Sequence, residues 1–569
     1  MSQKRIKRRN KLIDTEILAK NKENIGDVSV KDIIRKNFGF LTLCTFGTIL
    51  IYLNSLFGAF VSDDYATITQ NRNILNFDLG SITGYPGLVK YLVAVMFGTS
   101  NPFPYHLSSL LNYLIVILLV FIFTRLYFSN RISRYCTLIF SVLPIHIEVV
   151  SWISGLPYLG NAIFVLLFLI LFSIFLLNND WKYFYWSIFI ELLCIWAEPV
   201  RGLASIILLI LILLIFSEKF KVKINYFKIV FGLVCLMIVG LILLWPRILF
   251  RIGVVNSGIN FNNSIFYSPF EQYPASVSKY LQLLAFPTDL TLYHTMFVFP
   301  LWLSWSIILL YIVMLGYFFI KWKKGFFAMA FIFMATAPSM APVKVSWIVA
   351  ERYMFLGSIG FCIFLALIFE KIEKKFSIVA PILIGCIVII YCIRIFYRNI
   401  DWQTNHNLWT STCYVSPNSH NAWNNIGDDY DKVQDYKNAV KGFGMSFKIK
   451  PNYADAMHNQ GNVFFKIGRL DLAKEDYMMS VKTNPRMHQS YMAWTQIELI
   501  SGNYDTAYEL SKKIVDLQPN NPQSWHIMGL AFQYKGDLEN AKKAFTESYK
   551  LDSSYEPAVT SLKELEITK

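Results

Sequence analysis

Long uncharged runs alternate with short basic clusters along the first two-thirds of the chain. A membrane-spanning helix needs about 20 predominantly apolar residues, and several of these runs approach or reach that length. Because basic clusters mark the cytoplasmic ends of spans, the alternation also predicts a path through the bilayer. Eleven spans are expected from a cytoplasmic N-terminus, at residues 38–58, 107–124, 135–147, 158–177, 183–197, 202–216, 229–246, 299–320, 326–343, 354–369 and 377–396.

One further apolar segment, residues 276–289, is short and is interrupted by Pro287. A run of that length favours an interfacial or re-entrant helix over a span. With this assignment the lysines that follow the later spans remain cytoplasmic, as the positive-inside rule requires. The path then places everything after Arg398 on the extracytoplasmic side, together with the first loop.

The last third of the chain has a different pattern, which repeats with a fixed period. Prolines recur at one constant spacing, and alanines, large residues and most glycines recur in fixed phases within it. The recurring positions are Pro417, Pro451, Pro485 and Pro519, together with Ala439, Ala473, Ala507 and Ala541. This is the signature of tetratricopeptide repeats, which are helix–turn–helix units of about 34 residues. Four repeats are predicted, and such stacks present a concave surface that suits a protein partner.

Composition fits this division into a membrane part and a soluble part. Of the 569 residues, 55% are hydrophobic and only 16% are charged. The net charge of +15 does not indicate nucleic-acid binding, because the basic residues lie between apolar runs and act as topology signals. The eight cysteines lie mostly inside apolar runs and show no disulfide or metal-ligand spacing. No metal and no cofactor are therefore expected.

The predicted fold class is all-α, with a polytopic transmembrane helical bundle of about eleven spans followed by a tetratricopeptide α-solenoid. The expected parts are a cytoplasmic basic tail at 1–36, a membrane domain at 37–398, a linker at 399–415, and four extracytoplasmic repeats at 416–569.

Two adjacent carboxylates, Asp63 and Asp64, follow the first span directly. An acidic pair at this place can be a simple loop or a helix cap. It can also serve catalysis, with one carboxylate taking a proton from an attacking hydroxyl while the other orients it. The pair alone does not decide between these interpretations.

Other polar residues lie on the same predicted side of the membrane. Histidine and glutamate at membrane interfaces are often anchors or partners in ion pairs, whereas several cations together suit an anionic head group. The candidates are His106, His146, Glu148, Glu198, Arg201, Lys344, Glu351 and Arg352.

Taken in order, several short segments resemble one family, the transmembrane and tetratricopeptide-repeat O-mannosyltransferases. The segment Phe60-Val61-Ser62-Asp63-Asp64 is similar to the family's first-loop motif, and Pro144-Ile145-His146-Ile147-Glu148 is similar to its histidine/glutamate loop. Further similar segments are 101–107, 280–287, 351–356 and 358–361, and Arg398-Asn399 with Trp402. The chain departs from the pattern at Leu156-Pro157 and at Gly84-Tyr85-Pro86-Gly87, where arginines are expected, and its repeat array is short.

The resemblance implies a multi-pass glycosyltransferase of the C-type fold with a polyprenyl- or dolichyl-phosphate monosaccharide as donor. The sugar, with mannose expected, would pass to Ser or Thr hydroxyls of an acceptor protein that the repeats recruit. The implied base is Asp63 with Asp64 as its partner, and the departing phosphate would meet Arg352, with Lys344 or Arg201 as further candidates. The membrane would be the plasma membrane of a bacterium or the endoplasmic reticulum of a eukaryote.

Two other functions compete with this interpretation. A non-enzymatic membrane scaffold would use the repeats to bind partners and the spans only as an anchor, but eleven spans with clustered polar residues exceed that need. A lipid-linked-sugar transporter would place polar residues at the midplane of several spans, and only Glu191 clearly fits.

Overall fold

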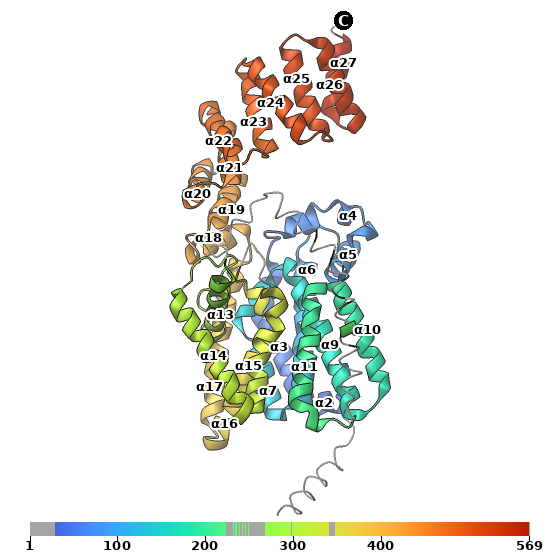
Figure 1. Ribbon diagram of the computed structural model, residues 1–569, viewed down its shortest axis with the longest axis vertical. Helices are drawn as coiled ribbons and strands as arrows, with labels where there is room; N and C mark the ends of the chain where they lie inside the picture. The colour runs from blue at the N-terminus through green and yellow to red at the C-terminus, as the bar shows by residue number, and fades with distance from the viewer. Residues whose placement is uncertain are drawn as a thin grey trace, which may run out of the picture. The chain divides into compact units, whose positions relative to one another are not determined.

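The computed structural model describes residues 29–222, 268–340 and 348–567, apart from residues 83 and 298, and isolated positions between 231 and 250. The described secondary structure is helical throughout, which confirms the predicted all-α class. The chain divides into two compact units, Met1–Leu408 and Trp409–Lys569. Figure 1 labels the helices of both units.

The first unit is built from long apolar helices that run side by side (Figure 1). Six of the described helices are long and apolar enough to cross a membrane, and a seventh span results if a pair of helices bent by 54° counts as one. The six are Phe38–Phe57, Phe103–Tyr127, Ile153–Asn178, Gly202–Lys219, Leu301–Lys321 and Val379–Asp401, and the bent pair is Asn130–Ser141 with Pro144–Ser151.

Three more predicted spans correspond to helices that are shorter or more charged: α10 (Trp181–Ala197), α15 (Lys323–Thr336) and α16 (Ser358–Lys375). The expected span at 229–246 lies outside the continuously described residues. The eleven-span path therefore stays a prediction, while the membrane character of the unit rests on its long apolar helices.

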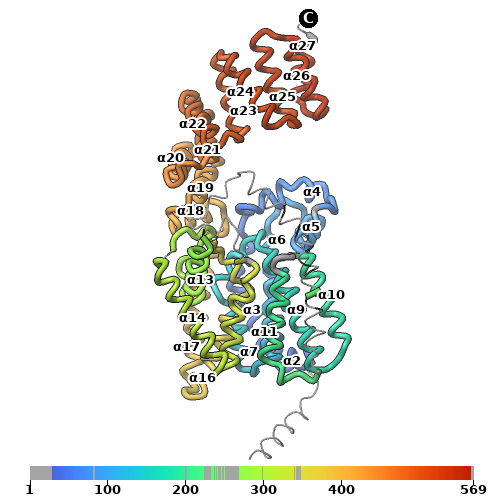
Figure 2. The backbone as a smooth tube through the Cα atoms, viewed as in Figure 1, coloured from blue at the N-terminus to red at the C-terminus, as the bar shows by residue number. Residues whose placement is uncertain are grey.

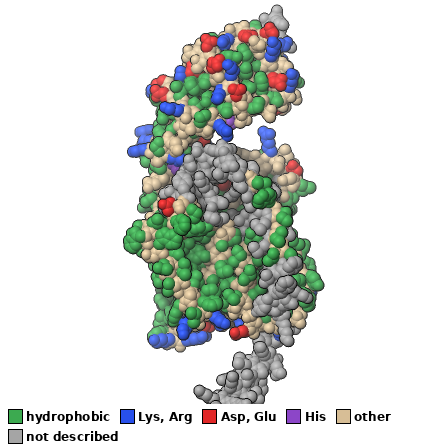
Figure 3. Space-filling model, viewed as in Figure 1, with side chains coloured by type: hydrophobic (Ala, Val, Ile, Leu, Met, Phe, Trp, Pro, Cys, Tyr) green, Lys and Arg blue, Asp and Glu red, His purple; other side chains and the backbone are tan. Residues whose placement is uncertain are grey.

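The helices of this unit differ in what surrounds them. Helix α9 (Leu156–Asn178) packs against α6 (Phe103–Tyr127) and α10, and most of its side chains are buried. Helices α14 (Leu301–Lys321) and α17 (Val379–Asp401) instead expose large apolar side chains such as Trp302 and Ile390. Figure 3 shows hydrophobic side chains along the flank of the unit, with Lys and Arg gathered at one end. An exposed apolar flank of this kind suits contact with lipid.

Shorter elements carry the polar loops of the first unit. Helix α5 lies in the long loop between the first two spans, and helix α13 occupies the segment expected to be interfacial. The elements are η1 (Leu53–Phe57), η2 (Tyr65–Thr69), α5 (Gly84–Phe97), η4 (Pro144–His146), α8 (Ile147–Ser151), η5 (Ile153–Gly155), α13 (Pro269–Ala285) and η8 (Glu351–Met354).

The second unit consists of four consecutive helical hairpins and a final helix (Figure 2). At each recurring glycine, the missing side chain lets an aromatic ring of the same hairpin approach the backbone closely. At Gly461, for example, an added Cβ would lie only 2.8 Å from the Tyr477 ring. The helices are α19 (His420–Lys432), α20 (Tyr436–Ile449), α21 (Ala454–Lys466), α22 (Leu470–Thr483), α23 (His488–Ile500), α24 (Tyr504–Leu517), α25 (Pro522–Tyr534), α26 (Leu538–Leu551) and α27 (Glu556–Ile567).

The segment expected to be a linker is largely helical. Helix α17 continues to Asp401, and α18 (Asn405–Val415) follows after a short break. Leu408 and Trp409 are buried, so apolar packing orders this stretch.

Candidate functional site

The two adjacent carboxylates lie between η1 and η2, where the first loop begins. Ser62 has a φ of 53°, a left-handed conformation that non-glycine residues seldom adopt. The two side chains that follow this bend have opposite environments, since Asp64 is fully buried while Asp63 is exposed. The loop therefore exposes the Asp63 carboxylate to solvent and buries the Asp64 carboxylate.

Asp64 fastens the first loop to the η5 segment. Its Oδ2 accepts a hydrogen bond from the Val61 N–H at 3.2 Å, and its Oδ1 accepts two from Ser154, from N–H at 2.9 Å and from Oγ at 2.6 Å. Burial raises the pKa of Asp64 to about 6, although these hydrogen bonds oppose the shift. The geometry makes Asp64 an anchor between segments that are 90 residues apart in sequence.

A buried lysine completes this cluster. The Lys90 side chain donates from Nζ to Thr67 Oγ1 at 2.9 Å and to Ser154 Oγ at 3.5 Å. Burial lowers the pKa of Lys90, and the charges of Asp64 and Asp63 oppose that shift. Sequence reasoning did not single out Lys90, Thr67 or Ser154. The available signal was that Lys90 is the one charged residue in the apolar helix α5.

A second pair joins the histidine/glutamate loop to the late loop. Glu148 on α8 accepts a hydrogen bond from the backbone N–H of Arg352 at 2.8 Å and a second from the Arg352 guanidinium. The two side chains are 1% and 11% exposed. The guanidinium also lies over the rings of Trp152 and Tyr353, at 5.5 and 5.1 Å. The structure thus brings together two residues that the sequence analysis selected independently.

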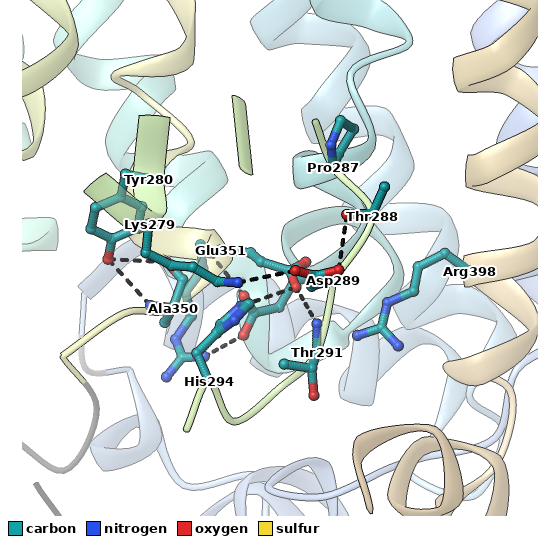
Figure 4. Close-up of polar contacts among 12 residues, drawn as sticks. Lys279, Tyr280, Pro287, Thr288, Asp289, Thr291, His294, Ala350, Glu351 and Arg398 are labelled. Atoms are coloured by element: carbon teal, nitrogen blue, oxygen red, sulfur yellow. Dashed lines mark hydrogen bonds and ion pairs between the residues drawn. The ribbon is translucent and has the colours of Figure 1, made fainter. Parts of the chain in front are cut away.

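A third cluster surrounds Glu351 (Figure 4). Its Oε1 accepts a hydrogen bond from the Thr291 N–H at 2.5 Å and lies 3.4 Å from His294 Nε2. Burial raises the pKa of Glu351 to about 7 and lowers that of His294 to about 3. Nearby, the buried Lys279 ammonium on α13 lies 3.3 Å from Asp289. The loop after α13 therefore holds the residue that precedes Arg352.

The polar residues of that loop were missed from the sequence. The segment that resembles the family, residues 280–287, ends before the loop that contacts Glu351. Nothing in the local pattern pairs Thr291 or His294 with a residue about 60 positions later.

The two candidate histidines are core residues. His146 lies between the Tyr113 hydroxyl, 2.9 Å from Nδ1, and Ser358 Oγ, 2.8 Å from Nε2. Both ring nitrogens of His146 are thus engaged, which favours a role in holding the loop. His106 is buried on α6 beside Gly58, where an added Cβ would lie 3.3 Å from Nε2.

The remaining candidates are placed less completely. Lys344 lies outside the described residues, and so does the side chain of Arg201. Glu198 is half-buried at the junction of α10 and α11 (Pro199–Phe216). Within the described part of the chain, no group of three or more His, Cys, Asp and Glu side chains could hold a metal ion.

Known proteins resemble this chain over most of its length. The human Protein O-mannosyl-transferase TMTC3 is 22% identical across 90% of this chain and 63% of its own length, and the mouse protein of that name is 21% identical across 91% and 64%. The human Protein O-mannosyl-transferase TMTC4 is 32% identical over 15% of this chain and 12% of its own length. The chain thus spans less than two-thirds of the length of the first two relatives.

The repeat region has its own matches. The tetratricopeptide repeat family matches residues 454–486 and 522–555. Two solved structures, MamA and the tetratricopeptide-repeat protein YrrB, cover 28% and 34% of this chain and 85% and 97% of their own chains. Their identities are 18% and 15%, and their TM-scores are 0.25 and 0.26. The relatives and the match to the tetratricopeptide repeat family confirm the resemblance to the transmembrane and tetratricopeptide-repeat O-mannosyltransferases.

Proposed function

We propose that this chain is an integral-membrane glycosyltransferase that moves a mannosyl group from a polyprenyl- or dolichyl-phosphate to a Ser or Thr hydroxyl of an acceptor protein. The observation that carries the proposal is the first loop, in which Asp63 is exposed while Asp64 is buried and tied to Ser154. Support also comes from relatives named protein O-mannosyl-transferases.

In the reaction, the acceptor hydroxyl oxygen forms a bond to the anomeric carbon of the sugar, and the bond from that carbon to the phosphate oxygen breaks. The electron pair of the broken bond leaves with the lipid phosphate. Asp63 takes the hydroxyl proton, which makes it the general base. Arg352 stabilises the charge that develops on the phosphate, as cations do for transferring phosphoryl groups.

Several groups hold these two residues in place. Asp64 and Ser154 fix the loop that carries Asp63, and Lys90 partly balances the charge of both carboxylates. Glu148 fixes the backbone and the guanidinium of Arg352. Trp152, whose ring faces Arg352, is two residues from Ser154, so the α8–η5 segment links the two parts of the site.

The site belongs at a membrane surface for a chemical reason. The lipid phosphate of the donor lies at the interface, so the groups that act on it must lie there too. Asp63 comes six residues after the end of the first apolar helix at Phe57. We place this surface on the extracytoplasmic side. The basic clusters lie in the N-terminal tail and in the loops at the opposite ends of the spans, and basic loops stay in the cytoplasm. The tetratricopeptide repeats would recruit the acceptor protein.

The test is transfer by Asp63→Asn in membranes supplied with radiolabelled polyprenyl-phosphate mannose and a Ser/Thr-rich acceptor. Loss of a general base costs about 10²–10⁴-fold in rate, so transfer should fall by at least 100-fold. Asp78→Asn is the matched control, because Asp78 is another exposed aspartate of the same loop. Undiminished transfer by Asp63→Asn would exclude Asp63 as the base. A wild-type protein that binds partners but transfers no sugar would favour the scaffold function instead.

A further inference from the structure

The bend that precedes Asp63 is held by a residue from a distant part of the first unit. Ser62 has a φ of 53°, and a non-glycine residue keeps such a conformation only where the surrounding structure fixes it. The Ser62 N–H donates a hydrogen bond to Oδ1 of Asn405 at 2.9 Å, across 343 positions of the chain. Tertiary structure, and not the local sequence, therefore fixes this bend.

A second hydrogen bond joins the same two segments. The Ala59 N–H donates to the backbone carbonyl of Gln403 at 2.8 Å. Gln403 lies in the short break between α17 and α18, and Asn405 is the first residue of α18. Of these two contacts with the first loop, only the one from Asn405 depends on the chemistry of a side chain.

Both chain neighbours of Asp63 are thus tied to other segments. Ser62 is bonded to Asn405, and the Asp64 carboxylate accepts two hydrogen bonds from Ser154. The Asp63 side chain between them stays exposed. An exposed carboxylate on a backbone that is fixed on both sides has a defined place from which to act.

The end of α17 also holds the other part of the site. Ser151 Oγ on α8 donates to Asn399 Oδ1 at 2.7 Å. The ring of Trp152, the next residue, has its centroid 5.9 Å from that of Trp402. Helix α8 carries the glutamate that holds Arg352. The stretch from residue 399 to 405, here called the α17–α18 junction, therefore contacts both the loop of the proposed base and the helix that holds the proposed phosphate cation.

We propose that Asn405 is a positioning residue for mannose transfer, which sets the place of the Asp63 carboxylate by fixing the backbone of Ser62. The inference rests on the proposed function, in which Asp63 is the base. A base must lie within hydrogen-bond reach of the hydroxyl that it deprotonates, and rotation about the Ser62 backbone would displace the side chain that follows. An amide oxygen accepts the hydrogen bond from Ser62 without adding a charge beside the two carboxylates.

The test combines hydrogen exchange with kinetics on the full chain in lipid nanodiscs. Exchange of the Ser62 amide is followed by mass spectrometry with electron-transfer fragmentation, and transfer uses polyprenyl-phosphate mannose with a Ser/Thr-rich acceptor. Asn405→Leu removes the acceptor atom but keeps the size of the side chain, whereas Asn405→Asp keeps an acceptor oxygen. Asn407→Leu is the matched control, because Asn407 lies on the same helix, is half-buried like Asn405, and donates to Ile400 O at 3.0 Å instead of contacting the loop.

Asn405→Leu should speed exchange of the Ser62 amide by about tenfold, as expected for one lost hydrogen bond. It should also lower kcat by at least about tenfold, because a small displacement of a reacting group is costly. The KM for the donor should stay unchanged, since the lipid phosphate is assigned to Arg352. Asn405→Asp and the control should match wild type in both exchange and kcat.

The outcomes separate a positioning role from a structural one. If Asn405→Leu only reduced the amount of folded protein, kcat per folded molecule would equal that of wild type, and the proposal would be overturned. Unchanged exchange of Ser62 would overturn it as well. A wild-type protein that transfers no mannose would refute the proposed function, while the exchange of Ser62 would still decide whether Asn405 holds the bend.

Discussion

The buried pair of Glu148 and Arg352 gives a sharp prediction about stability. Their side chains are 1% and 11% exposed, so neither charge has ready access to water. Removal of one partner of a buried ion pair costs about 3–5 kcal/mol, because the other charge stays buried without compensation. We therefore expect Glu148→Gln and Arg352→Met each to destabilise the first unit by about that amount.

The double variant should behave differently from the sum of the two single variants. Two independent losses would add to about 6–10 kcal/mol. When both charges are absent, no uncompensated charge remains, and the cost should be no larger than that of one single variant. The expected coupling energy is therefore at least about 3 kcal/mol, at the upper end for residues in direct contact.

Thermal unfolding in detergent micelles, followed by tryptophan fluorescence, measures these differences. The pair of Glu370 and Lys374 on α16 is the control, because its lysine side chain is 65% exposed and its glutamate side chain 16%. An exposed pair at this spacing contributes about 0.3–0.5 kcal/mol, so Lys374→Met should leave the midpoint almost unchanged. A double variant at the buried pair that unfolds at the sum of the two single shifts would refute the argument.

The same proteins separate folding from chemistry. A double variant that is no less stable than either single variant should still transfer no mannose, because it lacks the cation assigned to the departing phosphate. Transfer by this double variant would show that Arg352 serves the fold alone.

Two further predictions concern buried charges elsewhere in the chain. Lys90→Met should lower kcat for mannose transfer by more than tenfold, with little change in the KM for the donor. Lys90→Arg should restore part of the rate, because a cation again lies near Asp63 and Asp64. Equal kcat for Lys90→Met and wild type would contradict this role. In the repeats, Asp476 is 8% exposed and burial raises its pKa to about 7, from an ordinary value of 3.8. Folded protein then retains a proton that unfolded protein releases between about pH 4 and 7, so the stability of the second unit should fall as pH rises through this window. Asp476→Asn should flatten that slope in a thermal melt of the repeats, and a slope unchanged by the substitution would be evidence against it.

The repeats could be predicted from the sequence because their structure is local. The repeat period fixes the helix pair, its turn and its close-packing positions within one short stretch. Accordingly, Gly427, Gly461 and Gly529 each contact the ring of an aromatic residue 16 positions later.

The membrane loops could be predicted only in part, because their contacts join distant segments. The sequence pattern singled out Asp64, Glu148 and Arg352, but the hydrogen bonds of Asp64 to Ser154 and of Arg352 to Glu148 cross 90 and 204 residues. His294 has no local pattern that distinguishes it, and Lys90 is marked only as the one charged residue of the apolar helix α5. Such partners are fixed by tertiary packing.

The acidic pair shows how the two kinds of information combine. In the sequence, Asp63 and Asp64 are equivalent candidates for the base. In the structure, both oxygens of Asp64 accept hydrogen bonds from Val61 or Ser154, so this carboxylate is committed to the loop. A base needs a free lone pair that an acceptor hydroxyl can reach. Asp63 is exposed and directly follows the left-handed bend at Ser62, whereas the next carboxylate is buried. The pair is therefore best understood as one group that holds the loop and one group that the loop presents.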